Sequence, residues 1–236
     1  MPLPETQSPD LKLTNRREFL ARSAMAGGVI VFAAACSDSR ILDPDPDPEA
    51  VSFGTGNVAV LNYAYLLEQL EAAFYIMAAS NFYDGISTAE QNLLRDLRDH
   101  EVAHRDFLAT ALGGAALPTI EFDFSAVDFG SRTSVLTTAR TFEDLGVSAY
   151  NGAGRLFTTD TEGAALLTIA GKIVSVEARH AAAVRSAISS DPQAFAGSDV
   201  VDTTHALDVL RRPPEVLAAA APFVVTALDP SGIPTA

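Results

Sequence analysis

Apolar positions recur at three- and four-residue spacing in four long stretches of the chain, residues 57–80, 88–112, 132–158 and 162–190. Each stretch is far longer than an ordinary β-strand, and strand signals are few among them. The pattern therefore predicts four long helices and an all-α fold.

The ends and links of these helices predict how they pair. Ser87-Thr-Ala-Glu90 is a capping box that should open the second helix, and Gly113-Gly114 is a suitable stop after it. Short links join helices one to two and three to four, so each pair is expected to form an antiparallel αα-hairpin.

The segments between and after the hairpins are less regular. Residues 115–131, with Ile120, Phe122 and Phe124 in alternation, are long enough to cross over along the length of a four-helix bundle. Residues 191–236 should form an irregular extension that packs on the bundle. Within this extension, Pro213-Pro214 is expected to start a short helix.

The N-terminal segment has the pattern of an export signal. Residues 15–36 read NRREFLARSAMAGGVIVFAAAC, in which paired arginines precede an apolar stretch of about 13 residues. A membrane-spanning helix needs about 20 apolar residues, so residues 1–35 are predicted to be a signal peptide. Arg16 and Arg17 resemble a twin-arginine signal, whose pathway exports folded proteins to the periplasm or cell envelope.

The only cysteine, Cys36, ends this segment. Ala33-Ala34-Ala35-Cys36 resembles a lipoprotein cleavage box, which would make Cys36 a lipid attachment site and the protein membrane-anchored. Ala33 departs from the usual pattern, and the same alanines suit an ordinary signal peptidase, so an unmodified thiol is the alternative. Residues 36–56, which contain Asp43-Pro-Asp-Pro-Asp-Pro48, are predicted to be an acidic extended tether.

Composition excludes several classes of function. Thirty acidic residues against sixteen basic ones give a net charge of −14, so a phosphate-binding surface for nucleic acid is not expected. A single cysteine excludes an intramolecular disulfide framework and a thiolate zinc site.

A glutamate interrupts the apolar inward stripe of each predicted helix near its middle: Glu68, Glu101, Glu143 and Glu177. Helices one and three carry a tyrosine seven residues later, and helices two and four carry Glu-x-x-His. These further side chains are Tyr75, Tyr150, His104 and His180. Both spacings turn the side chains toward a common centre. An unpaired buried carboxylate costs several kcal/mol, so four of them together require positive charge.

The two halves of the chain repeat this arrangement. Glu68 and Glu143 are 75 residues apart, and Glu101 and Glu177 are 76 apart. A duplicated hairpin builds a bundle with an approximate two-fold axis through its polar centre. Four glutamates, two neutral imidazoles and two divalent cations sum to zero charge. Mixed carboxylate and imidazole ligands favour iron or manganese over calcium.

Over about residues 57–190, the chain resembles the ferritin-like dinuclear carboxylate proteins. One Glu on helices one and three, and Glu-x-x-His on helices two and four, carry the resemblance. The resemblance implies that all six glutamates and histidines named above are metal ligands. The export signal, LEQLEAAFY and EVLAAAAPFV look similar to exported ferritin-like proteins related to plant desiccation-associated proteins, a branch without a settled activity.

Other side chains have competing interpretations. Glu71, three residues after Glu68, could be an extra ligand or a proton relay, although we favour a solvated glutamate because Gly146 stands at its repeat position. Tyr75 and Tyr150 are expected to be core tyrosines with hydrogen-bonded hydroxyls rather than redox groups. They are also candidates, with Glu71, for residues that support the ligands.

A zinc protease is a further alternative. His100-Glu101-Val-Ala-His104 has the H-E-x-x-H pattern, in which both histidines bind zinc. That interpretation leaves Glu143, Glu177 and His180 unexplained, so we interpret His100 as a surface residue or one that supports a ligand. His205, in the extension, is expected to be solvated.

These observations lead to one expected function. The chain should be an exported, lipid-tethered protein with two divalent iron or manganese ions that consumes peroxide or dioxygen under envelope stress. A metal-binding or structural envelope protein without catalysis is the alternative. The sequence is compatible with a homodimer.

Overall fold

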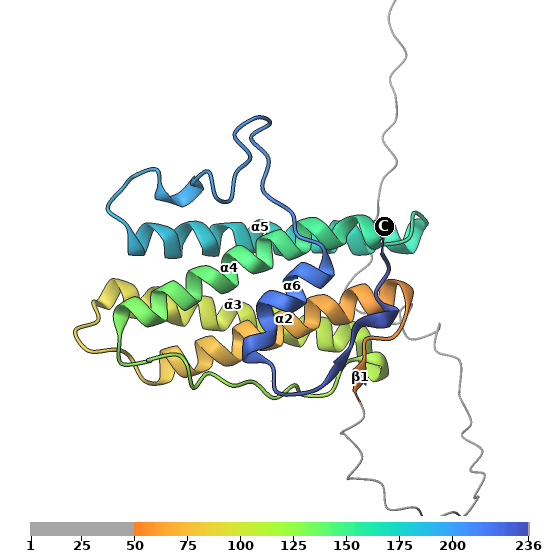
Figure 1. Cartoon of the computed structure of the whole chain (residues 1–236), viewed down its shortest axis with the longest axis horizontal. Helices are drawn as coiled ribbons and strands as arrows, with labels where there is room; N and C mark the ends of the chain where they lie inside the picture. The colour runs from red at the N-terminus through yellow and green to blue at the C-terminus, as the bar shows by residue number, and fades with distance from the viewer. Residues whose placement is uncertain (1–49, 236) are drawn as a thin grey trace, which may run out of the picture. The chain divides into compact units, whose positions relative to one another are not determined.

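A computed structural model describes residues 50–235 (Figure 1). The export signal at Arg16 and Arg17, lipidation of Cys36 and the tether up to residue 49 fall outside these residues, so they stay predictions. Within residues 50–235, no helix combines the length and hydrophobicity that crossing a bilayer requires.

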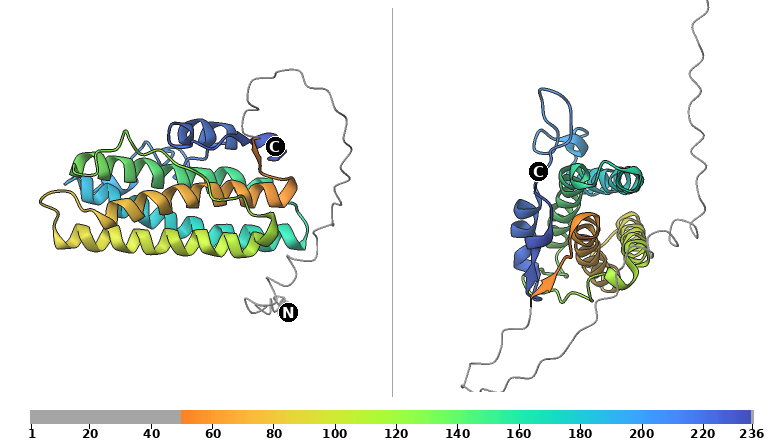
Figure 2. Two further views of the ribbon diagram at one scale, coloured as in Figure 1. Left: turned by 90° about the horizontal axis from the view of Figure 1, so that it is seen from below. Right: turned by 90° about the vertical axis from the view of Figure 1, so that its right-hand side faces the viewer.

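Four long helices form the core, which confirms the all-α fold. They are α2 (Gly56–Ser80), α3 (Thr88–Leu112), α4 (Arg132–Ala153) and α5 (Thr161–Ile188). Figures 1 and 2 show α2 beside α3 and α4 beside α5, and these two hairpins pack on each other through α2 with α4 and α3 with α5. Helices α3 and α5 begin and end within two residues of the predicted positions. Helix α4 ends at Ala153, earlier than the predicted residue 158. A 3-10 turn follows it, and this turn rather than a continued helix brings Phe157 into the core.

The predicted start and end of α3 are present. The Glu90 backbone N–H donates to Ser87 Oγ, and the Ser87 backbone N–H donates to Glu90 Oε2, both at 3.2 Å. Gly113 ends the helix with a φ of 55°, in the left-handed region that glycine adopts without strain. This capping box and glycine stop fix the register of α3, and therefore the height of Glu101 and His104 in the bundle.

Two buried amides on α2 hold the crossover against the bundle. Asn62 accepts a hydrogen bond from the Leu117 backbone N–H, and Gln69 accepts one from the Ile120 N–H, both at 3.0 Å. Ile120 and Phe124 are buried, and Phe122 between them is half-buried. Phe124 lies in an aromatic cluster with Phe74 of α2 and with side chains of α4 and the C-terminal segment.

The C-terminal extension packs on the bundle. Its short helix α6 (Pro213–Ala220) lies against α4 and buries Val216 completely (Figure 2). The Arg211 backbone N–H donates to the Ser148 carbonyl at 2.9 Å. The chain can approach α4 this closely because Gly152 has no side chain, since a Cβ there would lie 1.8 Å from the Arg211 carbonyl oxygen.

The start of the described chain differs from the predicted tether. Strand β1 (Val51–Ser52) pairs in parallel with β2 (Leu228–Asp229), and Phe53 is fully buried. The expectation that the tether continues to residue 56 is therefore wrong for residues 51–53. Burial of Phe53 holds this segment against the bundle. The partner of β1 comes from the C-terminal segment, which is distant in sequence, so the pattern around residues 51–53 could not predict the pairing.

Candidate metal centre

The four long helices bring six acidic and histidine side chains together in two overlapping groups. One group contains Glu68, Glu101, His104 and Glu177, and the other contains Glu101, Glu143, Glu177 and His180. Within each group, one nitrogen or oxygen atom per residue lies within 4.8 Å of the others. Glu101 and Glu177 belong to both groups, whereas Glu68 and His104 belong only to the first group and Glu143 and His180 only to the second.

Both histidines turn Nδ1 toward the carboxylates. His104 Nδ1 lies 3.0 Å from Glu177 Oε1, and His180 Nδ1 lies 2.7 Å from Glu101 Oε1. Each histidine is three residues after a glutamate on its own helix, which puts both side chains on one helix face. Each imidazole therefore contacts a glutamate of the other hairpin: His104 of α3 contacts Glu177 of α5, and His180 of α5 contacts Glu101 of α3.

The donor atoms fit a cation. All four glutamates are fully buried. Six of their oxygens lack a hydrogen-bond partner among the described residues, and so do Nδ1 of His104 and Nδ1 of His180. These oxygens are Glu68 Oε2, Glu101 Oε1, Glu101 Oε2, Glu143 Oε2, Glu177 Oε1 and Glu177 Oε2. Buried polar atoms are rarely left unpaired, so a set of them facing one point indicates a site for metal ions.

Two tyrosines hold the outer oxygens of this cluster. The Tyr75 hydroxyl of α2 donates to Glu143 Oε1 of α4 at 2.6 Å. Tyr150 of α4 donates to Glu68 Oε1 of α2. The expectation of buried tyrosines with hydrogen-bonded hydroxyls is confirmed, and the exchange between α2 and α4 follows the predicted two-fold axis. Each bond leaves the second oxygen of its glutamate free to face a cation.

The carboxylates and imidazoles of the cluster shift one another's pKa values. Burial raises the pKa of Glu68 to about 7. Burial alone would lower the pKa of His104, but the nearby carboxylates of Glu101, Glu177 and Glu68 favour the charged imidazole and raise its pKa to about 12. Burial alone would raise the pKa of Glu101, but the two nearby imidazoles outweigh burial and lower its pKa to about 2. Metal ions bind these ligands in competition with protons.

His100 contacts the centre from outside. Its Nδ1 lies 2.9 Å from Nε2 of His180, and the two rings stack. His100 belongs to neither ligand group, and Glu101 is fully buried between the helices. This arrangement contradicts the zinc protease interpretation, which needs His100 and His104 on one ion. It agrees with a residue that orients His180.

Glu71 is buried, so the favoured interpretation of a solvated glutamate is wrong. Its exposed fraction is 3 %. A Cβ built on Gly146 would lie 3.1 Å from Glu71 Oε1 and 3.5 Å from Glu177 Oε2. The side chain therefore fills the space that the missing side chain of Gly146 leaves. His205, by contrast, is exposed and lies 2.7 Å from Asp202, as expected for a solvated residue.

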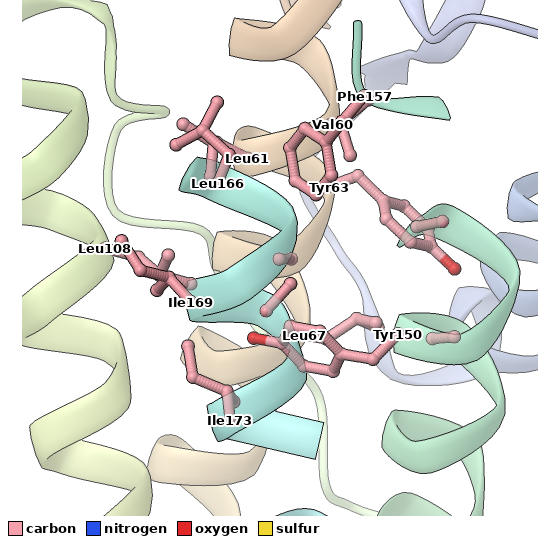
Figure 3. Close-up of a pocket in the computed structure, with 14 residues that line it drawn as sticks. Val60, Leu61, Tyr63, Leu67, Leu108, Tyr150, Phe157, Leu166, Ile169 and Ile173 are labelled. Carbon is pink, nitrogen blue, oxygen red and sulfur yellow. The ribbon is translucent and has the colours of Figure 1, made fainter. Parts of the chain in front are cut away.

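Two openings flank the centre. A groove of about 420 Å³ between α3 and α5 is lined by His100, His104 and His180, and connects the histidine side to solvent. Figure 3 shows a narrow apolar pocket of about 20 Å³, with Tyr63 and Tyr150 among its lining residues. A space of this size holds about one water-sized molecule. The wider approach to the centre is therefore from the histidine side.

The sequence pattern did not predict three features of the site. Sharing of Glu101 and Glu177, contact of His100 with His180, and burial of Glu71 all depend on how the helices pack. For Glu71 a signal is present in the sequence, because the 75-residue repeat aligns it with Gly146. A glycine opposite a glutamate leaves room for that glutamate in the core.

Comparison with known proteins agrees with this geometry. The family model described as a ferritin-like domain matches residues 56–190, which span all four helices of the bundle. A search of curated protein sequences finds no match to the chain. The match covers more than half of the chain and contains every residue of the two ligand groups, so the chain belongs to the ferritin-like domain family.

Proposed function

We propose that this protein binds two iron or manganese ions and uses them to consume peroxide or dioxygen at the cell envelope. The observation that carries the proposal is the pair of four-residue groups that share Glu101 and Glu177. Two adjacent redox-active ions supply two-electron chemistry toward such oxidants.

The ligand chemistry supports iron or manganese. Each group offers three carboxylates and one imidazole, a set of oxygen and nitrogen donors without thiolate. Copper and zinc compete strongly for open sites of this kind. Export of an already folded protein by the predicted twin-arginine signal would allow loading inside the cell, away from that competition.

The protein around the ligands supports access by a small molecule. His104 is 15 % exposed on its side chain, whereas the four glutamates are not exposed at all. Peroxide could approach along the groove on the histidine side, while the buried carboxylates stay dry. Electrostatic interactions are stronger in such an environment of low dielectric constant.

The decisive experiment measures metal in the untagged protein purified from its native envelope, by elemental analysis. We expect two iron or manganese ions per chain, and peroxide decay whose rate scales with metal content. His180→Ala removes a ligand and is expected to lose at least one ion. His100→Ala removes only the side chain that contacts His180. This variant should retain both ions at reduced affinity, because residues that support a metal ligand typically contribute about 10- to 100-fold in affinity.

The outcomes separate the classes of function. Two bound ions that never change oxidation state with peroxide or dioxygen would indicate a metal-binding protein without catalysis. A native preparation without transition metals would contradict the proposal altogether. Loss of metal in His100→Ala with full metal in His180→Ala would restore the protease interpretation.

A further inference from the structure

We propose that a pocket between the end of α4, the start of α6 and the C-terminal segment binds a small amphiphilic carboxylate, such as a medium-chain fatty acid. We call it the C-terminal pocket. It contains none of the residues of the two metal-ligand groups, so the inference does not depend on the proposed function. Its volume is about 510 Å³, within the range of about 300–1,000 Å³ that is typical of small-molecule sites.

The walls of the C-terminal pocket are largely apolar. The C-terminal segment returns alongside α6 toward the end of α4 (Figure 1). The 3-10 turn after α4 contributes Leu156, α6 contributes Leu217, and the C-terminal segment contributes Ile233. Ile233 is buried, whereas the two leucines are half-buried. An alkyl chain that covers the leucines removes their apolar surface from water, which favours binding.

Four prolines make these walls rigid: Pro213, Pro214, Pro230 and Pro234. Proline fixes its own φ and has no N–H group, so the backbone here resists collapse and offers few donors to hold water. The C-terminal segment is also packed closely from behind, because a Cβ on Gly232 would lie 1.8 Å from the Gly54 carbonyl oxygen. A preformed pocket needs little ordering when a ligand binds.

Two arginines at the C-terminal pocket indicate an anionic ligand. Arg155 and Arg212 both line the pocket and are exposed. Within residues 50–235, neither side chain forms an ion pair. The chain has 16 basic residues against 30 acidic ones, so two arginines left unpaired by the described acids stand out. A guanidinium group binds a carboxylate well, because its N–H donors match the two oxygens.

The acidic side chains nearby do not cancel this charge. Asp229 also lines the pocket, and its Oδ1 accepts a hydrogen bond from the Ser231 N–H at 3.0 Å. Glu215 Oε2 accepts one from the Arg212 backbone N–H at 2.7 Å and so caps the start of α6. The lining therefore carries two positive charges and one negative charge. One carboxylate brings the sum to zero, which favours a ligand with a single negative charge.

The test measures binding of decanoate to the purified protein by isothermal titration calorimetry. Decanol and acetate are the ligand controls, because decanol lacks the charge and acetate lacks the alkyl chain. We expect one decanoate per chain, decanol at least about tenfold weaker, and no measurable binding of acetate. A crystal structure with decanoate should place its carboxylate beside Arg155 and Arg212.

Three substitutions locate the site. Arg155→Gln and Arg212→Gln each remove one positive charge from an exposed position, so both variants should fold. Each is expected to weaken decanoate about tenfold and to leave decanol unchanged. Leu217→Trp fills the pocket with a larger ring and should weaken decanoate and decanol alike.

Arg95→Gln is the matched control for charge. Arg95 is also an exposed arginine, but it lies on α3 and does not line the C-terminal pocket. Decanoate affinity should change less than twofold in this variant. Metal content should be the same in all four variants, because none of these residues belongs to a ligand group.

Several results would overturn the proposal. One is the absence of any heat of binding at about 1 mM decanoate. Another is decanoate affinity that does not change in Arg155→Gln, Arg212→Gln and Leu217→Trp. A dimer that Leu217→Trp dissociates, in a protein that binds no decanoate, would instead assign the pocket to an interface between copies of the chain.

Discussion

Replacing Tyr75 by phenylalanine removes one hydroxyl from the centre and little else. That hydroxyl donates to Glu143 Oε1 at 2.6 Å, and both residues are fully buried. A hydrogen bond to a charged group contributes about 1.5–3 kcal/mol, and no water can replace it at a buried position. Because Glu143 then loses the donor that orients it, we expect Mn²⁺ affinity to fall about 10- to 100-fold, or about 1.4–2.7 kcal/mol.

The assay is competition for Mn²⁺ with a chelator of known affinity, and Tyr63→Phe is the matched control. Tyr63 is also a buried tyrosine of α2, but its hydroxyl has no hydrogen-bond partner among the described residues. Removing that hydroxyl should change Mn²⁺ affinity less than twofold and leave stability the same or higher. Equal losses in Tyr63→Phe and Tyr75→Phe would refute the reasoning, because the effect would then come from packing.

Three further predictions concern stability. In the metal-free protein, burial raises the pKa of Glu68 to about 7, and nearby carboxylates outweigh burial and raise the pKa of His180 to about 10. The folded state therefore holds protons that the unfolded chain releases, and the Tm of the metal-free form should fall as pH rises from about 5 to 8. Adding Mn²⁺ should reverse this trend, since metal replaces those protons; a flat Tm profile without metal would contradict the assignment. Ser87→Ala removes the cap of α3 and should lower the free energy of unfolding by about 1 kcal/mol in urea, whereas a neutral result would argue against the capping box. Arg185→Leu removes the bonds to Asp144 and Asp199 at 2.7 and 2.8 Å, so limited proteolysis should cut faster within residues 190–210; an unchanged rate would show that these bonds do not hold the segment.

The helices and the ligand set could be predicted from the sequence for a local reason. The 3.6-residue period fixes the direction of each side chain relative to its own helix axis. Glu101 and His104 must therefore share a face, and a polar pair on an apolar stripe stands out in the sequence. Repetition of that pattern at Glu177 and His180 indicates a two-fold arrangement from the sequence alone.

Contacts between side chains of different helices could not be predicted from the sequence in the same way. Which oxygen meets which nitrogen depends on the rotation and offset of packed helices, and these follow from the whole core. Only the tertiary structure placed Glu101 and Glu177 in both ligand groups and His100 against His180. Glu71 is the clearest case, because its burial depends on a side chain that is absent from a different helix, at Gly146. The sequence by itself determined the helices and the six converging side chains; packing decided how the two groups share them and that Glu71 is buried beside Gly146.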